Sequence, residues 1–403
     1  MSTYYTSYSA LGQHRACPQR FFYSRIRNLE KVDPDDVRVE LEFGNWWHAL
    51  RAADSIERGR ALGSIQHVPD TLSPTDDIEI PTTGRHLPGT VYGEAHAWWD
   101  RQTPFVQETW VGRLGESLPE RLAYVDARWR EQHAYAMEHE EPLGVEVKWR
   151  RELPSVGQHV RDGGEPEMVN PDTAMVGYID EVYYDTQRRI VVVRDHKTSK
   201  TLGTQSVIDD MMDSQLQVYA WGASPLITGW GRGPIRAVAY DRVRTVKPTE
   251  PSLTKSGRLT VRDGQPSISN CDLHTYRTWA YGVLGAGVPY EGLKKDGSAA
   301  GFYHEEPEIV ERLSTPQAQS IWFQRTLTPL NRNVVETHLR SAVDTALDVV
   351  QTRVRAEISG QAGRNLTAAN CRWCDFASLC RAEMVGGAGG EYDLAEFKLR
   401  EKN

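Results

Sequence analysis

The chain has 403 residues, with 47 Lys and Arg against 55 Asp and Glu, so its formal net charge at pH 7 is −8. This length supports a large hydrophobic core, which excludes a small fold that depends on disulfides. No apolar run approaches the roughly 20 residues of a membrane helix, and the N-terminus lacks the apolar stretch of a secretory signal. We therefore expect a protein of the reducing cytoplasm with no membrane partner.

The acidic surplus argues against a protein that coats DNA non-specifically, because such proteins usually carry excess positive charge. Positive charge gathers locally instead, in two groups. These groups are Arg188, Arg189, Arg194, Lys197 and Lys200, and then Arg232, Arg236, Arg242, Arg244, Lys247, Lys255, Arg258 and Arg262. Such groups are typical of a confined track that holds DNA, or of solvated faces without a ligand.

The chain contains no internal repeat and no low-complexity linker, so we predict one elaborated domain over residues 1–403. Segments rich in proline, glycine and polar residues indicate two insertions, at 60–115 and at 231–310, and the second carries the larger basic group. Within the first insertion, residues 60–92 are expected to form a surface excursion. Residues 386–390 are expected to form a flexible tail.

Regular elements are predicted from residue 118 onward. Apolar residues recur at helical spacing over 118–139, and Pro119 suits the first turn of that helix. Alternating polarity over 145–149 predicts a half-buried strand. Runs rich in β-branched residues at 176–184 and 190–197 predict an antiparallel hairpin.

Two further helices complete the expected set of elements. They are predicted over 206–220 and 334–359, and Gly360 is placed to cap the second. A helix, then strands, then helices predict an α+β fold, with a central mixed β-sheet flanked by helices.

The predicted hairpin places two acids and a lysine close together. Side chains alternate along a strand, so Asp195 and Lys197 share a face while His196 points away. Depending on the turn, Asp180 lies opposite Asp195 or two residues off. Two half-buried carboxylates that close repel each other, and a hard divalent cation such as Mg²⁺ or Mn²⁺ would resolve the conflict. The plain alternative is a surface hairpin with scattered acids, which the apolar run before Asp195 and the lysine on its face disfavour.

The segment from Gly177 to Asp180, followed by Asp195 and Lys197, resembles the core of the PD-(D/E)XK nuclease superfamily. The resemblance implies a restriction-endonuclease-like core in which Asp180 and Asp195 bind the metal. It also implies that Lys197 positions or activates the attacking water. Ile179 stands where the family often has proline before the first acid.

Two helix motifs resemble those of the RecB-type branch of that superfamily. Gly44 and His48 match its N-terminal GxxxH motif, which implies that His48 is a further metal ligand. Gln215 and Tyr219 match its QxxxY motif. Their i, i+4 spacing puts an amide and a phenol side by side, able to orient Lys197 or to contact a phosphate.

Two further groups of residues leave alternatives open. Glu146 resembles an acid of the same branch and is assigned as a metal ligand, with Glu152 as a competitor. Trp46, Trp47 and Tyr219 have the aromatic rings that single-strand binders stack on bases, but they could equally belong to the core, which we favour for Trp47.

Four cysteines form a pattern that joins the two ends of the sequence. Cys371, Cys374 and Cys380 cluster near the C-terminus, and Cys17 lies near the N-terminus. In a reducing compartment clustered thiols indicate a metal, although one distant cysteine with a triplet is unusual for zinc. The pattern is similar to that of RecB-type iron–sulfur nucleases such as AddB nuclease domains and CRISPR-adaptation exonucleases. The resemblance implies a 4Fe-4S cluster, while Cys271 falls outside the pattern.

The resemblance implies a metal-dependent DNA exonuclease that acts on single strands or DNA ends, in recombination, repair or phage DNA processing. DNA is the expected partner, together with a possible recombination or single-strand-binding protein. No Walker A motif accompanies the nuclease motifs, so no helicase is predicted. The alternative from another class is a non-catalytic scaffold, stabilised by iron–sulfur or zinc, that binds DNA or a partner. A third hypothesis is a sequence-specific restriction endonuclease.

Overall fold

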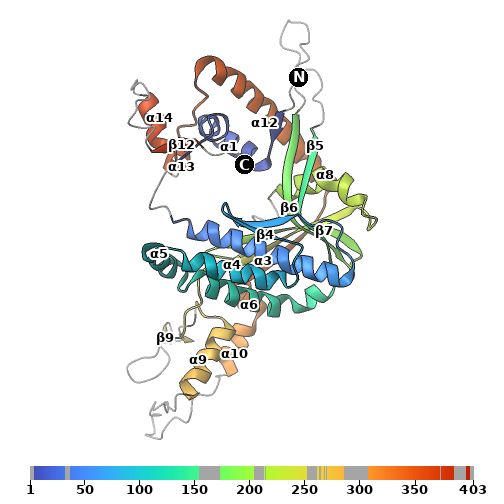
Figure 1. Cartoon of the computed structure of the whole chain (residues 1–403), viewed down its shortest axis with the longest axis vertical. Helices are drawn as coiled ribbons and strands as arrows, with labels where there is room; N and C mark the ends of the chain where they lie inside the picture. Colours follow the sequence, from blue (N-terminus) through green and yellow to red (C-terminus); the bar gives the residue numbers. More distant parts are fainter. Residues whose placement is uncertain are drawn as a thin grey trace.

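A six-stranded mixed sheet forms the centre of the computed structural model of this chain (Figure 1). The model describes residues 4–31, 37–153, 173–203, 213, 215–251, 261–262, 265–266, 268, 270–285, 307–372, 374–384 and 396–399. The strands follow the order β1-β6-β7-β8-β11, and β5 pairs with the other edge of β6. They comprise β1 (Tyr4–Thr6), β5 (Glu140–Glu152), β6 (Thr173–Asp185), β7 (Ile190–Ser199), β8 (Ile235–Arg244) and β11 (Phe323–Pro329).

The pairing of these strands leaves a gap along one edge of β6. β7 pairs antiparallel with Glu181–Asp185 of this edge, and β1 pairs parallel with Thr173–Met175 of the same edge. β7 itself continues beyond its pairing with β6, parallel to β8, as far as Ser199. The sheet therefore forks at the end of the β6–β7 hairpin, and residues 176–180 of β6 face the opening.

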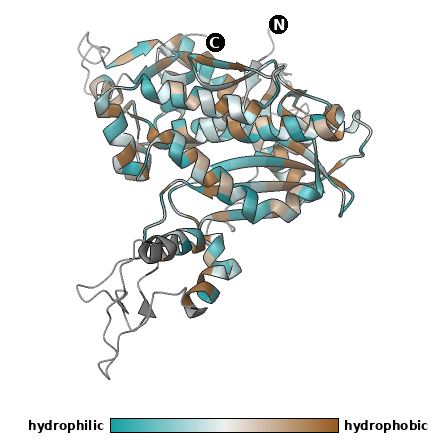
Figure 2. Ribbon diagram, turned by 60° about the horizontal axis from the view of Figure 1, so that its bottom comes forward, coloured by the Kyte–Doolittle hydropathy of each residue, from teal (hydrophilic) through white to brown (hydrophobic). Residues whose placement is uncertain are grey.

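Helices cover both faces of the sheet, and each face has its own hydrophobic core (Figure 1). Figure 2 shows hydrophobic and hydrophilic residues alternating along these helices, as expected for helices with one buried side. The first layer contains α3 (Val39–Leu62), α4 (Leu87–Asp100), α5 (Pro104–Leu114) and α6 (Leu118–Glu138), and the second contains α1 (Tyr8–Ala16), α8 (Gln215–Thr228) and α12 (Arg332–Ser359). None of the helices in this described part of the chain is long and apolar enough to cross a bilayer.

The two ends of the chain lie side by side above the sheet (Figure 1). The Gln19 N–H donates to the Gly363 carbonyl at 2.8 Å, and α1 packs against α12. The N-terminal part contains α2 (Pro18–Phe21), the π-helical turn η1 (Phe22–Ile26) and β2 (Leu29–Lys31), and the C-terminal part contains α13 (Ala368–Arg372), α14 (Ala377–Met384) and β12 (Phe397–Leu399), which pairs with β2.

The elements predicted from the sequence are largely confirmed. The helix at 118–139 is α6, whose Ser117 and Glu120 form a capping box, and the predicted hairpin is β6 with β7. α12 ends at Gly360, which adopts the left-handed conformation with φ of 71°. The helix predicted at 206–220 begins at Gln215 in α8, and its earlier part lies outside the described residues, as does the predicted tail at 386–390.

The surface excursion predicted at 60–92 is wrong for much of its length. α3 continues to Leu62, and the hairpin of β3 (Thr71–Thr75) and β4 (Ile78–Pro81) packs onto it. Side chains of this hairpin and of α4 enter the first core, among them Leu72, Ile78, Ile80, Leu87 and Val91. The prolines of this segment therefore do not mark an uncovered loop, since Pro74 lies within β3, Pro81 ends β4 and Pro88 lies in the first turn of α4.

The insertion predicted at 231–310 begins later, because β8 belongs to the central sheet. After Arg244 the chain leaves the sheet, and Figure 1 shows α9 and α10 projecting from the helical layer. This part has a small core of its own around Tyr276 and Ile309. Its elements are β9 (Val261–Arg262), β10 (Gln265–Pro266), α9 (Leu273–Gly285), α10 (Pro307–Ser314) and α11 (Pro316–Ser320).

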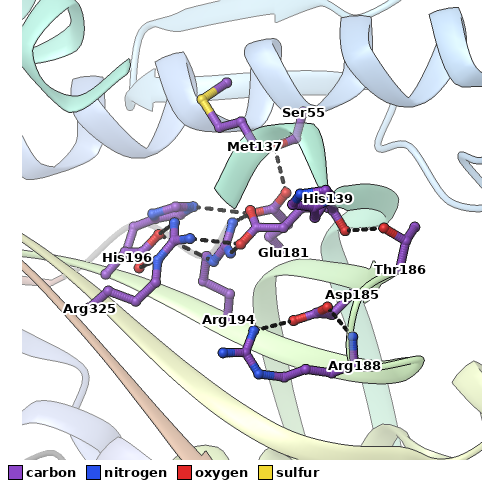
Figure 3. A network of polar contacts seen from close by, with 12 residues as sticks. Ser55, Met137, His139, Glu181, Asp185, Thr186, Arg188, Arg194, His196 and Arg325 are labelled. Carbon is purple, nitrogen blue, oxygen red and sulfur yellow. Dashed lines mark hydrogen bonds and ion pairs between the residues drawn. The ribbon is translucent and has the colours of Figure 1, made fainter. Parts of the chain in front are cut away.

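A buried network of charges joins the sheet to the first helical layer (Figure 3). Arg194 on β7 contacts three acids, with distances of 2.6 Å to Glu140, 2.8 Å to Glu181 and 3.2 Å to Asp241. Glu181 also accepts a hydrogen bond from Ser55 of α3 at 2.7 Å. Burial would raise the pKa of Glu181, but the Arg194 guanidinium lowers it well below its usual range. Glu181 therefore stays charged because Arg194 compensates it.

Replacing Arg194 with Ala should lower the free energy of unfolding by about 3–5 kcal/mol, because three buried carboxylates lose their shared cation. The matched control is Arg188→Ala, which removes a 58% exposed side chain while the buried Asp185 keeps its hydrogen bond from the Arg188 backbone N–H, and it should change stability by less than about 1 kcal/mol. Urea denaturation of the three proteins measures both effects. Equal losses in the two variants would contradict the structural role given to Arg194.

Candidate active site

The fork of the sheet places Asp180 at the point where β6 and β7 separate. Glu181 and Arg194 form the last pair of the β6–β7 ladder. One residue further, the Asp180 Oδ2 accepts a hydrogen bond from the His196 backbone N–H at 2.7 Å. The Asp180 side chain thus occupies the opening and satisfies a backbone donor that the ladder no longer pairs.

Glu146 lies at a sharp turn in the neighbouring strand. Val145 packs in the core beneath α3, whereas Val147, two residues on, packs in the opposite core with α8 and α12. Since regular alternation would put both on one face, the strand changes face at Glu146. Glu146 accordingly has φ of 46°, in the left-handed region that non-glycine residues rarely adopt. Such strained positions cost about 1–3 kcal/mol and cluster at functional sites.

His48 of α3 completes a compact group with these two acids. The His48 Nδ1 lies 3.3 Å from the Asp180 Oδ2. One ligand atom each from His48, Glu146 and Asp180 lie within 4.8 Å of one another. Gly44 allows the close approach of α3, since a Cβ at this position would lie 3.1 Å from Thr198 Oγ1 on β7. The GxxxH spacing therefore combines a packing residue with a possible ligand, one helical turn apart.

Asp195 and Lys197 lie beside this group rather than in it. The Lys197 Nζ lies 2.8 Å from the Asp195 Oδ2, so the two residues form an ion pair on one face of β7. Burial by itself lowers the pKa of Lys197, but the charge of Asp195 reverses this and raises the pKa above its usual value. The lysine is therefore a fixed cation next to the acids.

Burial and neighbouring acids raise the pKa values of two acids of the site. Burial and the charges of Asp180 and Asp195 raise the pKa of Glu146 to about 8. Burial and Asp180 raise the pKa of Asp195 to about 7, although Lys197 opposes the rise. Carboxylates and an imidazole that converge in this way have the donor set of a site for a divalent cation, whose charge would offset their repulsion. The residues present thus fit a bound Mg²⁺ or Mn²⁺.

The two residues of the QxxxY motif contact each other at the start of α8. Burial raises the pKa of the Tyr219 phenol, the Gln215 side chain opposes this rise, and Asp195 and Lys197 also act on the phenol electrostatically. The Asp213 Oδ1, which no sequence motif indicated, accepts the Gln215 N–H at 2.7 Å and so starts the helix. These contacts place the motif against the Asp195–Lys197 pair.

Three aromatic residues considered for base stacking are buried. Trp46 and Trp47 have no exposed surface, and Tyr219 is 8% exposed and packs edge-on against Trp149. All three are core residues, so the stacking role is wrong for each of them. Glu152, the competitor of Glu146, lies on the exposed end of β5, six residues from the strand turn.

The four cysteines of the predicted pattern come together although the sequence separates them widely. Cys17, Cys371, Cys374 and Cys380 line one cavity of about 90 Å³ where the two ends of the chain meet. Burial raises the pKa of the Cys374 thiol, and the Cys17 thiolate contributes to the rise. Cys271 is buried elsewhere, in the small core of α9 and α10. All five thiols are free.

The buried charges behind the site were missed from the sequence. Arg194 was counted with a basic surface group, yet it is 1% exposed and pairs with Glu140, Glu181 and Asp241. An arginine that directly follows an apolar strand run signals such a buried partner set, because an unpaired charge would not be tolerated there. Other members of the basic groups are also paired, such as Lys200 with Glu40.

Comparison with known families identifies the class of protein that this fold and site define. Residues 5–381 match the model of the PD-(D/E)XK nuclease superfamily, so the chain belongs to that superfamily. Among solved structures it is similar to a phage-related exonuclease from Haemophilus somnus 129PT, at 13% identity and a TM-score of 0.21, over 52% of this chain and 64% of that one. The comparison with curated proteins found no match.

Metal should stabilise the protein more at high pH than at low pH. The folded, metal-free protein has a pKa near 8 for Glu146 and near 7 for Asp195. Because it binds these protons more tightly than the unfolded chain does, protonation stabilises the fold fully below the unfolded pKa values. This stabilisation is lost as pH rises through about 7–8. The melting temperature in EDTA should therefore fall between about pH 6 and pH 8.5, and the rise caused by Mn²⁺ should grow over that range. Thermal unfolding of wild type and Glu146→Gln measures this. A rise that is independent of pH, or unchanged in the variant, would contradict the site.

Proposed function

We propose that this protein is a metal-dependent deoxyribonuclease of the RecB-type branch, which acts as an exonuclease on single-stranded DNA or DNA ends. Membership of the nuclease superfamily supplies the reaction class, phosphodiester hydrolysis. The observation that carries the proposal is the convergence of His48, Glu146 and Asp180 beside the Asp195–Lys197 pair. That arrangement combines acidic and imidazole ligands with a fixed cation at an opening of the sheet.

In this proposal His48, Glu146, Asp180 and Asp195 hold Mg²⁺ or Mn²⁺. When bound, the ion supplies positive charge to the phosphate and makes a water easier to deprotonate. Lys197 holds its ammonium group at the same place, where it orients the attacking water and stabilises negative charge that develops on the phosphate. Asp195 positions this ammonium through their 2.8 Å contact.

Gln215 and Tyr219 are assigned as residues that orient Lys197. Both side chains lie near Lys197 and Asp195, and the burial of Tyr219 keeps its phenol protonated by raising its pKa. A neutral phenol and an amide can direct the lysine without adding charge to the site. Loss of either side chain would leave the ammonium free to adopt other rotamers.

The proposed biological setting is recombination, repair or phage DNA processing in the cytoplasm. DNA is the proposed substrate, and a recombination or single-strand-binding protein is a possible partner. A reducing compartment suits the five free thiols.

We further propose that Cys17, Cys371, Cys374 and Cys380 hold a 4Fe-4S cluster that ties the chain ends together. Four thiols around one cavity support this assignment. A single zinc ion with bonds of about 2.3 Å needs its sulfurs about 3.8 Å apart. Among the described residues, however, no three cysteine sulfurs lie within 4.8 Å of one another. The thiols as described do not match the spacing of a single zinc ion, and the choice of a 4Fe-4S cluster rests on the resemblance of the cysteine pattern to iron–sulfur nucleases.

The nuclease assignment predicts that purified protein cleaves single-stranded DNA with Mn²⁺, and that Asp195→Ala and Lys197→Ala each lose about 100-fold or more of this activity. The control Lys398→Ala removes a lysine that pairs with Glu30 far from the fork and should retain activity. Oligonucleotides labelled at the 5' or 3' end report cleavage and its direction. Absence of cleavage by wild type would favour a non-catalytic scaffold, and equal cleavage by all proteins would remove the proposed site.

The cluster assignment predicts that anaerobically purified protein is brown and contains iron and sulfide. Cys374→Ala should be colourless and less stable, because the chain ends lose their shared ligand. The matched control is Cys271→Ala, which removes a buried thiol of the α9–α10 core and should keep the colour. Absorption spectra and metal analysis test this. A colourless wild type that contains zinc would contradict the assignment.

A further inference from the structure

We infer that the exposed face of the β5–β6 ribbon binds single-stranded DNA and guides it into the active site. The binding surface, here called the ribbon strip, consists of Tyr5, Lys148, Arg150 and Tyr178. This inference rests on the proposed nuclease function and adds to it a surface that selects single strands.

The ribbon strip is a direct continuation of the active site. Lys148 lies two residues beyond Glu146 on β5, and Tyr178 lies two residues before Asp180 on β6. Trp149 and Ile179 pack in the core of the second helical layer, so their sequence neighbours Lys148 and Tyr178 point to the other side, from which His48 of α3 approaches the acids. They are also direct cross-strand partners in the β5–β6 register. The next cation of β5 on this face is Arg150.

The side chains of the strip are exposed and available to a ligand. Tyr178 is 54% exposed and Tyr5 is 51% exposed, which is unusual for aromatic residues in a sheet. The Lys148 Nζ lies 5.6 Å from the centre of the Tyr178 ring, and the Arg150 guanidinium lies 4.8 Å from that of Tyr5. Within the described part of the chain neither cation has a carboxylate partner. Among the residues that the structure describes, the recorded partners of the two cations are therefore the tyrosine rings.

The opposite face of the ribbon explains why this face stays open. Trp149, between the two cations in sequence, points to the other side and packs against Tyr219 of α8. Gly177 and Gly222 make room for its ring, since a Cβ on either would lie within 3.0 Å of it. The second helical layer thus covers only one side of the ribbon, and Figure 1 shows β5 and β6 extending beyond the first layer.

This combination of groups fits a single strand better than a duplex. Aromatic rings can stack on unpaired bases while neighbouring cations contact the phosphates. Same-face residues of a strand are about 6.8 Å apart, so the two aromatic–cation pairs form a regular series along the ribbon. The bases of a duplex already stack on each other and would leave both tyrosines without a partner.

Binding of a fluorescent oligothymidylate and of a matched duplex, measured by anisotropy in EDTA, tests the inference without cleavage. Tyr178→Thr should weaken oligothymidylate binding at least about fivefold, whereas Tyr178→Phe should retain it because the ring remains. The double variant Lys148→Gln and Arg150→Gln should reduce the slope of log affinity against log salt by about 1.4. Tyr135→Ala, which removes an exposed tyrosine on α6, is the control and should bind like wild type.

The outcomes separate this inference from the proposed function. Unchanged binding in Tyr178→Thr and in the double variant, equal weakening on duplex and single strand, or no binding by wild type would each overturn the ribbon strip, whether or not the enzyme cleaves DNA. Failure of the nuclease proposal is a different result, namely wild type that binds the oligothymidylate but does not cleave it with Mn²⁺. Melting temperatures of all variants close to that of wild type exclude loss of the fold as the cause.

Discussion

The separation of β6 from β7 is the constraint on which the site depends. As long as two strands are paired, their backbone donors and acceptors satisfy each other, and no side chain is needed between them. After the pair of Glu181 and Arg194 this arrangement ends, and the Asp180 carboxylate accepts the His196 N–H instead. The opening admits His48 from the helical layer and Glu146 from the neighbouring strand. A compact acidic group can thus form inside a sheet without breaking its core.

Opposite charges on the two sides of the fork keep these acids in place. On the side of the first helical layer, Arg194 and Arg325 compensate Glu140, Glu181 and Asp241, and the network is closed to solvent. On the open side, Lys197 pairs with Asp195, and the His48 ring lies 3.3 Å from Asp180. The buried network stabilises the strands, and the acids on the open side attract cations. The β6–β7 hairpin therefore carries both the buried charge network and the acidic group.

Local pattern was enough to predict most of this fold, and short motifs were enough to predict which residues gather. The helix of α6, the β6–β7 hairpin and the cap at Gly360 follow from spacing and capping rules that involve neighbours in sequence. The change of face at Glu146 was not predictable, because alternation assumes a regular strand and does not foresee a left-handed residue within it. The burial of Arg194 was missed for a related reason, and the burial of Trp46 was left open. Whether a charge or an indole is buried depends on distant segments that pack over it.

The meeting of the two chain ends has a consequence for biosynthesis. Cys17 and Cys380 are 363 positions apart, and β2 near the N-terminus pairs with β12 near the C-terminus. At about 5–20 residues per second, the ribosome needs about 20–70 s to synthesise the residues between Cys17 and Cys380. During that interval β2 lacks its strand partner and Cys17 lacks the three C-terminal thiols that line the same cavity. The pairing of β2 with β12 thus waits until Phe397–Leu399 have been synthesised.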